Sequence, residues 1–252
     1  MRVGNIAEVS TSCKVTIPSM RPQNDQLARY VTAELRALAD PAKAPAMAAY
    51  MKTAQAFYGV PTPRRAIIVR ETRDRFVPAD QKSYERNVLA LWKLPYREEQ
   101  YCAIAYARQH PRFITPSALW LYERMIREGA WWDFVDEIAV NLVGTVLGNF
   151  RAKTRPIIER WCDDPDMWIR RTALLAHLKH KKETDAAQLF DHCLRRADER
   201  EFFIRKAIGW ALREYSKTDP RAVRGFLKNN RQRLSNLSYA EGSKHLARAN
   251  SR

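Results

Sequence analysis

Segments rich in tryptophan, phenylalanine and arginine recur about every 35 residues in the second half of this chain. Trp168–Arg171 is followed, 35 positions later, by Phe203–Lys206, and a related aromatic segment, Trp131–Asp136, precedes both. A period of this length is typical of helix pairs that stack into a solenoid. Because equivalent helices place equivalent side chains in line, such an array also builds a concave surface. The repeat therefore predicts an all-α solenoid with a concave binding face.

Two kinds of residue recur in these segments, and we expect them to lie in different places. Trp168, Phe203, Ala173 and Ala207 have the spacing of side chains that pack between helices. The arginines beside them, such as Arg171, carry long cationic side chains that suit a track for phosphates. The apolar positions are therefore expected in the core and the arginines on the concave face.

Helical spacing extends through most of the chain. Leu27, Val31 and Leu35 follow a capping candidate, Asn24, and Asp40 ahead of a proline ends the pattern. With eight glycines in all, strand-and-hairpin architectures are disfavoured. Further helices are expected at residues 45–58, 63–76, 81–92, 97–110, 116–128, 132–149, 153–162, 166–179, 184–197, 201–215, 219–230 and 237–248.

The first 24 residues show no helical period. They mix β-branched, polar and proline residues, which is typical of a flexible terminal extension. We therefore expect an N-terminal extension over residues 1–24 and one helical-repeat domain over residues 25–248.

The net charge of the chain indicates which class of partner it binds. The chain carries 44 Lys and Arg against 28 Asp and Glu, a formal net charge of +16, with most of the excess after residue 150. This balance favours a nucleic-acid partner over a basic surface that binds nothing. The four cysteines lack metal-ligand spacing and are typical of reduced thiols in the cytoplasm. We expect no metal, no cofactor and no membrane span.

The candidate chemistry lies around Asp136. Trp132 and Asp136 are four residues apart and share a helix face, while Arg171 follows one repeat later and Trp210 two repeats later. The chain lacks P-loop, dinucleotide-binding, zinc-protease and nucleophile-elbow motifs, so no other cluster competes. From spacing alone, a structural salt bridge or helix cap and a functional carboxylate are equally good interpretations of Asp136.

A carboxylate kept in a positive groove suggests a cationic target or intermediate. Cleavage of an N-glycosidic bond produces one, because the sugar develops oxocarbenium character as the base leaves. Tryptophan faces attract cations by about 0.5–2 kcal/mol per contact. The pattern therefore favours N-glycoside cleavage on DNA.

Several motifs closely resemble those of the AlkD-type bacterial DNA alkylation repair glycosylases, over about residues 25–245. The resemblance implies a HEAT-like α-solenoid that excises positively charged N3- and N7-alkylated purines, such as 3-methyladenine and 7-methylguanine, from duplex DNA. It also implies that the lesion is held without a snug base-flipping pocket. In chain order the matching motifs are Met47–Lys52, Gly59–Arg65, Leu91–Pro95, Trp131–Asp136, Trp168–Arg171 and Lys206–Tyr215.

Carried over residue by residue, the resemblance makes Asp136 the catalytic carboxylate and Trp132 and Trp210 the aromatic walls beside the sugar. Pro61 departs from the family pattern and lacks an N–H donor, which weakens the case for a phosphate contact at that position. The residues that the resemblance implies to contact DNA are Tyr50, Thr62, Arg65, Arg171 and Arg213.

The resemblance thus implies a monofunctional glycosylase of base excision repair, acting as a monomer on alkylated duplex DNA in the bacterial cytoplasm, at the nucleoid. A second interpretation is a non-catalytic helical-repeat protein that binds branched or distorted DNA. A third, a protein–protein scaffold, predicts a more neutral surface. The joint presence of Trp132, Asp136 and Trp210 favours the enzyme.

Overall fold

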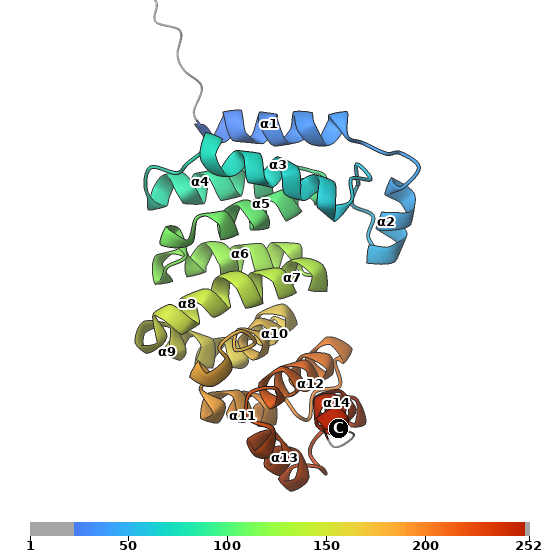
Figure 1. Cartoon of the computed structure of the whole chain (residues 1–252), viewed down its shortest axis with the longest axis vertical. Helices are drawn as coiled ribbons and strands as arrows, with labels where there is room; N and C mark the ends of the chain where they lie inside the picture. The colour runs from blue at the N-terminus through green and yellow to red at the C-terminus, as the bar shows by residue number, and fades with distance from the viewer. Residues whose placement is uncertain (1–22, 250–252) are drawn as a thin grey trace, which may run out of the picture.

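Helices follow one another through residues 23–249, the part of the chain that the computed structural model describes, and no strand occurs in this part (Figure 1). The all-α class expected from the repeat is confirmed. The expected extension over residues 1–24 lies outside the described range, apart from its last two residues.

The helices are labelled in chain order. The α-helices are α1 (Gln23–Ala37), α2 (Ala44–Met51), α3 (Thr62–Arg75), α4 (Gln81–Trp92), α5 (Arg97–Gln109), α6 (Leu119–Gly129), α7 (Trp132–Ile138), α8 (Gly144–Asn149), α9 (Arg151–Cys162), α10 (Met167–Leu175), α11 (Ala186–Arg195), α12 (Phe202–Ser216), α13 (Pro220–Asn229) and α14 (Asn236–Ala249). Shorter 3₁₀ segments are η1 (Pro111–Phe113), η2 (Pro116–Ala118) and η4 (Lys181–Glu183), and η3 (Ala139–Val143) is a π-helical turn.

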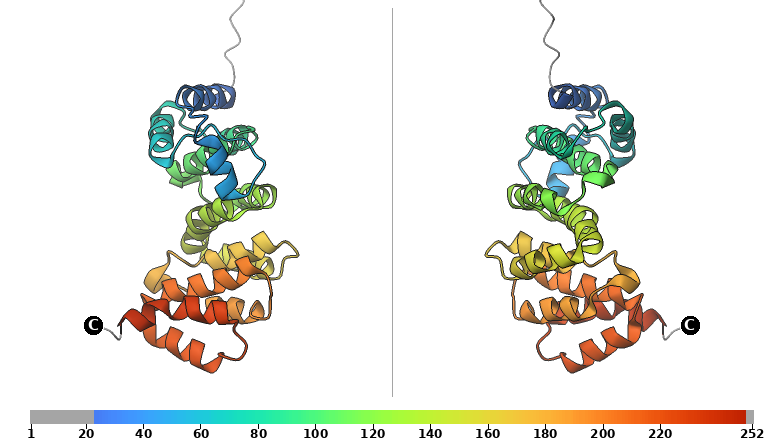
Figure 2. Two further views of the ribbon diagram at one scale, coloured as in Figure 1. Left: turned by 90° about the vertical axis from the view of Figure 1, so that its right-hand side faces the viewer. Right: turned by 90° about the vertical axis from the view of Figure 1, so that its left-hand side faces the viewer.

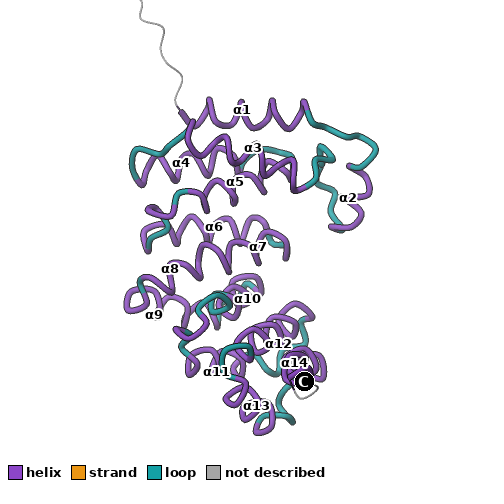
Figure 3. The backbone as a smooth tube through the Cα atoms, in the orientation of Figure 1, coloured by secondary structure: helices purple, strands orange, loops and turns teal. Residues whose placement is uncertain are grey.

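The helices stack into an elongated column, with α1 at one end and α13 and α14 at the other (Figure 1). From the sides, α1 is seen end-on whereas α12–α14 are seen lengthwise, so the helix axes turn along the column (Figure 2). Most connections are short, and α2 stands at the edge of the column between two longer loops (Figure 3). This arrangement is the helical-repeat solenoid that the period predicts. Within the described part, no helix is both long enough and apolar enough to cross a bilayer.

Aromatic side chains from successive repeats form a ladder inside the column. The ring centroids of Trp131 and Trp168 lie 5.9 Å apart, and those of Trp168 and Phe203 lie 4.9 Å apart. Trp168 is buried, and Ala173 and Ala207 are fully buried. The packing role expected for these recurring residues is confirmed. Because burying one large apolar side chain contributes about 1.5–3 kcal/mol, the ladder helps to tie neighbouring repeats together.

Some helix ends differ from the sequence-based expectation. The helix expected over 45–58 is too long, because Lys52 adopts a left-handed conformation (φ 51°) and ends α2 at Met51. The helix expected over 132–149 is interrupted by the π-helical turn η3 between α7 and α8. Apolar periodicity continues through both places, so it does not mark these boundaries.

The helices α12 and α14 approach each other closely at Gly209. A Cβ atom on Gly209 would lie 2.5 Å from the Cβ of Glu241 and 2.9 Å from the carbonyl oxygen of Ser238. Only glycine leaves room for this contact. The contact fixes the position of Glu241 next to α12.

Candidate functional site

A cleft of about 1050 Å³ opens on one side of the column, between α2 and α12. A smaller cavity of about 330 Å³ shares Trp132 and Trp210 with the cleft and contains Arg171 and Arg213. The structure therefore brings all the expected site residues to one region. The expected residues that line the larger cleft are Tyr50, Thr62, Arg65, Trp132, Asp136 and Trp210.

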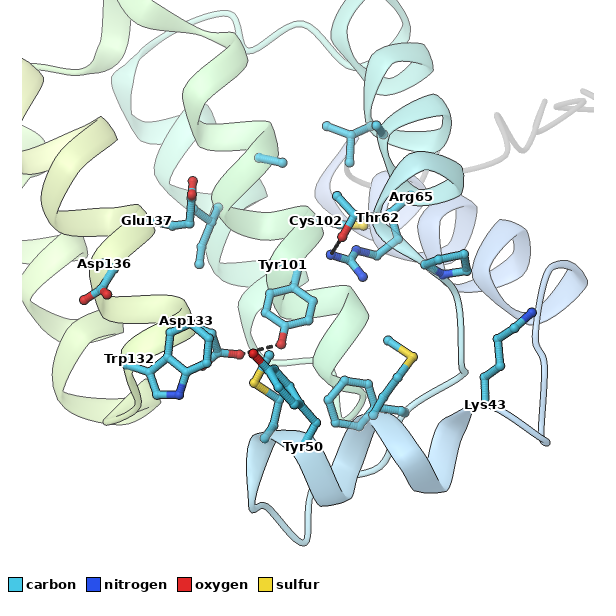
Figure 4. Close-up of a pocket in the computed structure, with 18 of the residues that line it drawn as sticks. Lys43, Tyr50, Thr62, Arg65, Tyr101, Cys102, Trp132, Asp133, Asp136 and Glu137 are labelled. Atoms are coloured by element: carbon cyan, nitrogen blue, oxygen red, sulfur yellow. Dashed lines mark hydrogen bonds between the residues drawn. The ribbon is translucent and has the colours of Figure 1, made fainter. Parts of the chain in front are cut away.

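Helix α7 supplies the centre of the cleft. Trp132 is its first residue, and Asp136 follows one turn later on the same face. Figure 4 shows both side chains on the cleft side of α7, with Tyr50 reaching toward Trp132 from α2. The i, i+4 spacing read from the sequence thus places an aromatic ring beside a carboxylate.

Asp136 forms a two-pronged ion pair with Arg171 of α10. The Arg171 Nε–Asp136 Oδ1 distance is 2.7 Å, and the Nη2–Oδ2 distance is 2.8 Å. The third nitrogen, Nη1, donates to the carbonyl oxygen of Phe203. The Arg171 side chain is only 5% exposed. This geometry differs from the phosphate contact expected for Arg171, because all three guanidinium nitrogens are already hydrogen-bonded within the protein.

Opposing effects act on the pKa of Asp136. Burial raises the pKa of this carboxyl above its usual value, and the hydrogen bonds and charge of Arg171 act in the opposite direction. Each carboxyl oxygen accepts an N–H from the guanidinium, which favours the ionised form. Arg171 therefore helps to keep a largely buried carboxylate charged.

A second ion pair of the same kind lies one turn earlier on α7, and its carboxylate also lines the cleft. Arg97 of α5 binds Asp133, with Nη2–Oδ1 and Nε–Oδ2 distances of 2.6 and 3.0 Å, and both side chains are buried. The Tyr101 hydroxyl also donates to Asp133 (Figure 4). The Arg97 guanidinium lies 4.1 Å from the ring centroid of Phe134. Thus α7 is anchored to the preceding repeat through Asp133 and to the following repeat through Asp136.

The opposite wall comes from α2 and α3. Tyr50 is 73% exposed and lines the cleft from α2. Arg65 of α3 donates to the carbonyl oxygen of Val60 and to the Thr62 hydroxyl, each at 3.0 Å. Its guanidinium also lies 4.5 Å from the ring centroid of Tyr101. These contacts hold the cation at the cleft wall.

A buried carboxylate shapes the loop before α3. Glu98, on α5, accepts backbone N–H groups from Tyr58, Gly59 and Val60 at 2.8–3.1 Å. Gly59 has φ +85°, and a Cβ atom there would lie 2.1 Å from the carbonyl oxygen of Asp40, so glycine is required. The loop therefore enters α3 in a fixed direction, which sets the position of Thr62.

One group of side chains, outside the cleft, is clustered closely enough to coordinate a metal ion. Ligand atoms of Glu159, Asp191 and His192 lie within 4.8 Å of one another. Arg195 donates to both carboxylates, at 2.9 and 3.2 Å. Because the guanidinium already neutralises these ligands, we assign the group no metal role.

Several residues that shape the site were not predicted from the sequence. Asp133, Glu98 and Glu241 are buried carboxylates, and each is recognisable only through its partners. One clue was available for the first of them: Arg97 precedes Asp133 by 36 residues, close to the 35 that separate Asp136 from Arg171. The repeat period thus also predicts pairing between charges one repeat apart.

Comparison with known proteins gives consistent results. A family profile described as "DNA alkylation repair enzyme" matches residues 31–246. A solved structure of a predicted DNA alkylation repair enzyme from Enterococcus faecalis is 31% identical, with a TM-score of 0.77, and the match covers 83% of this chain and 97% of that one. The structure of smu.31 from Streptococcus mutans UA159 shares the fold, with 17% identity, a TM-score of 0.56, and coverage of 71% of this chain and 94% of that one. No curated protein matches the chain significantly.

Proposed function

The chain belongs to the family of DNA alkylation repair enzymes, and from that premise we propose that it is a monofunctional DNA glycosylase. The proposed reaction is hydrolysis of the bond between deoxyribose and a positively charged N3- or N7-alkylated purine in duplex DNA. The observation that supports it most is Asp136, held by Arg171 in a cleft that Trp132 and Trp210 also line.

Asp136 is suited to stabilise positive charge on the sugar. As the base leaves, charge develops at the anomeric carbon and the ring oxygen, and a nearby carboxylate attracts it. Opposite unit charges about 4 Å apart attract by about 4 kcal/mol at an effective dielectric constant of 20, and the positive charge of the paired Arg171 reduces this attraction. The same carboxylate can orient a water molecule for attack on the sugar cation.

The aromatic side chains suit a cationic substrate. Trp132 and Trp210 line both the cleft and the adjoining cavity, so their rings flank the space next to Asp136. Ring faces attract cations and pack against the apolar surface of deoxyribose. An alkylated purine that already carries positive charge is a good leaving group, so the proposed mechanism requires no strong general acid.

The remaining predicted residues are proposed to hold the duplex. Tyr50, Thr62 and Arg65 lie on the α2–α3 wall, and Arg213 lies on the α12 side. The Arg171 side chain is proposed to act mainly through Asp136. The protein would bind DNA as a monomer, with the damaged nucleotide facing the cleft.

Release of free bases tests this function directly. The protein is incubated with dimethyl-sulfate-treated duplex, and released 3-methyladenine and 7-methylguanine are separated by chromatography. We expect release of both bases, and strand breaks only after alkali treatment, because the reaction leaves an intact abasic backbone. Undamaged duplex is the control. Tight duplex binding with no base release would instead support the non-catalytic DNA-binding alternative.

A further inference from the structure

Three cationic side chains surround one buried carboxylate on the α12–α14 side of the cleft. Glu241, on α14, has a side chain only 4% exposed. It accepts hydrogen bonds from Lys206 at 2.5 Å and Lys244 at 2.6 Å, and also from Arg213. The cations themselves remain partly exposed, at 38%, 56% and 31% respectively.

The cluster carries more positive charge than its carboxylate needs. Burial raises the pKa of Glu241, but hydrogen bonds from Lys206 and Lys244, with the charges of Lys206 and Arg213, outweigh it and lower this pKa to about 2. Glu241 is therefore ionised at neutral pH and neutralises one cation. Two positive charges remain in excess, on side chains that reach solvent.

The cluster lies beside the proposed reaction centre. Lys206, Arg213 and Glu241 line the cavity that also contains Trp132 and Trp210. Lys244 joins them from α14, which packs against α12 through the Gly209 contact. The close packing of α14 against Gly209 fixes the position of Glu241, and the hydrogen bonds of Glu241 hold the three cations beside the cavity.

Arg171 and Arg213 line the same cavity but differ in burial and in hydrogen bonding. Its guanidinium is almost fully buried, and its three nitrogens donate to Asp136 and Phe203. Arg213, by comparison, contacts Glu241 through Nη1 alone among the described residues and is 31% exposed. A planar guanidinium with remaining donors, next to a lysine ammonium, matches the oxygens of a phosphate diester.

We propose that Lys206 and Lys244 join Arg213, already proposed to hold the duplex, in a phosphate-binding subsite for the DNA backbone beside the lesion, and that Glu241 organises the three cations. The inference rests on the proposed function only in taking duplex DNA as the ligand. Glu241 acts as a positioning residue: it holds together three cations that would otherwise repel one another and spread into solvent. Its own negative charge opposes DNA binding, so the two effects of removing it have opposite signs.

The salt dependence of binding to undamaged duplex tests the subsite. The slope of log K against log[salt] is measured for the wild type and for Lys206→Ala. Each lost phosphate contact lowers the magnitude of this slope by about 0.9, and that decrease is expected for Lys206→Ala. The matched control is Lys153→Ala, an exposed lysine on α9, which lies on the opposite side of the column (Figure 1). Its slope should equal that of the wild type.

Glu241→Gln tests the positioning role by its sign. If Glu241 organises the cations, this variant binds DNA more weakly and with a smaller salt slope, although it has lost a negative charge. Glu137→Gln removes an exposed carboxylate from the adjoining larger cleft and should bind DNA slightly more tightly. Circular dichroism and thermal unfolding confirm that each variant is folded.

The possible outcomes separate this proposal from the proposed function. An unchanged slope for Lys206→Ala, or tighter binding by Glu241→Gln, overturns the subsite even if the wild type releases alkylated bases. Binding of inorganic phosphate that depends on Lys206, with an unchanged duplex slope, would also overturn it, because the site would then take free phosphate. Smaller slopes for both variants support the subsite even if no base is released.

Discussion

Replacement of Arg171 by methionine should raise the pH below which base release declines. Asp136 is only 16% exposed, and its two oxygens accept bonds of 2.7 and 2.8 Å from Arg171. Removing one partner of a buried ion pair typically costs about 3–5 kcal/mol. Because one pKa unit corresponds to 1.36 kcal/mol, this free-energy cost would equal a rise of roughly 2–4 units in the pKa of Asp136. Cleft water can reach Asp136, and its solvation of the carboxylate makes the rise smaller. We expect an upward shift of about 2 units.

The direction of the pH shift follows because the reaction requires Asp136 in its ionised form. Burial already raises the pKa of Asp136, and without Arg171 the carboxyl gains its proton at still higher pH. The protonated acid cannot stabilise the sugar cation. A two-unit shift lowers the ionised fraction by up to about 100-fold on the acid side, with a smaller effect at alkaline pH.

The assay is single-turnover release of 7-methylguanine between pH 5 and pH 8.5, corrected for spontaneous depurination. Arg170→Met is the matched control, because Arg170 makes a similar two-pronged ion pair with Glu199. That pair is not part of the cleft, so the pH profile should remain that of the wild type. An unchanged profile for Arg171→Met, with uniformly weaker binding to all duplexes and a salt slope smaller by about one, would restore the phosphate contact and refute this reasoning.

Two further predictions concern stability. Gly209→Ala should destabilise the fold by about 1–3 kcal/mol, because its Cβ would overlap Glu241, whereas Gly225→Ala on α13 meets nothing within 4 Å and should gain up to about 1 kcal/mol of helix propensity. Urea unfolding measures both changes, and equal effects would contradict the packing argument. Burial, together with the charge of His192, lowers the pKa of His177 well below 6.5. The unfolded chain therefore binds the proton first as pH falls below 6.5, and stability decreases by up to about 1.4 kcal/mol per pH unit; His177→Leu should reduce this slope, and an unchanged slope would exclude His177 as its source.

The repeat period predicted more of the site than any single motif did. It placed Trp168 and Phe203 in the core ladder, and it aligned Trp132, Arg171 and Trp210 around adjoining cavities. Periodicity succeeds here because each repeat packs against its neighbours in the same way. The spacing that left a salt bridge and a functional carboxylate open for Asp136 was informative as well, since the structure shows that the salt bridge exists.

Apolar spacing does not reveal the backbone conformation at a helix end, nor which charged side chains pair across repeats. The end of α2 at Met51 depends on the left-handed backbone of Lys52, which apolar spacing does not encode. The pairing of Arg171 was missed because a cationic side chain has the same sequence signature whether it binds phosphate or carboxylate. Glu241 gained its importance from the Gly209 contact, which only the packing of α14 on α12 reveals.

The most direct test of the account is single-turnover base release by wild type and Asp136→Asn. Asparagine keeps the shape of the side chain and removes its charge, so the rate should fall by about 10²–10³, most for 7-methylguanine and less for 3-methyladenine, which departs more readily. Asp133→Asn breaks the neighbouring ion pair of α7 and controls for loss of stability; its rate should fall much less. Equal rates for the wild type and Asp136→Asn would contradict the central role of this carboxylate.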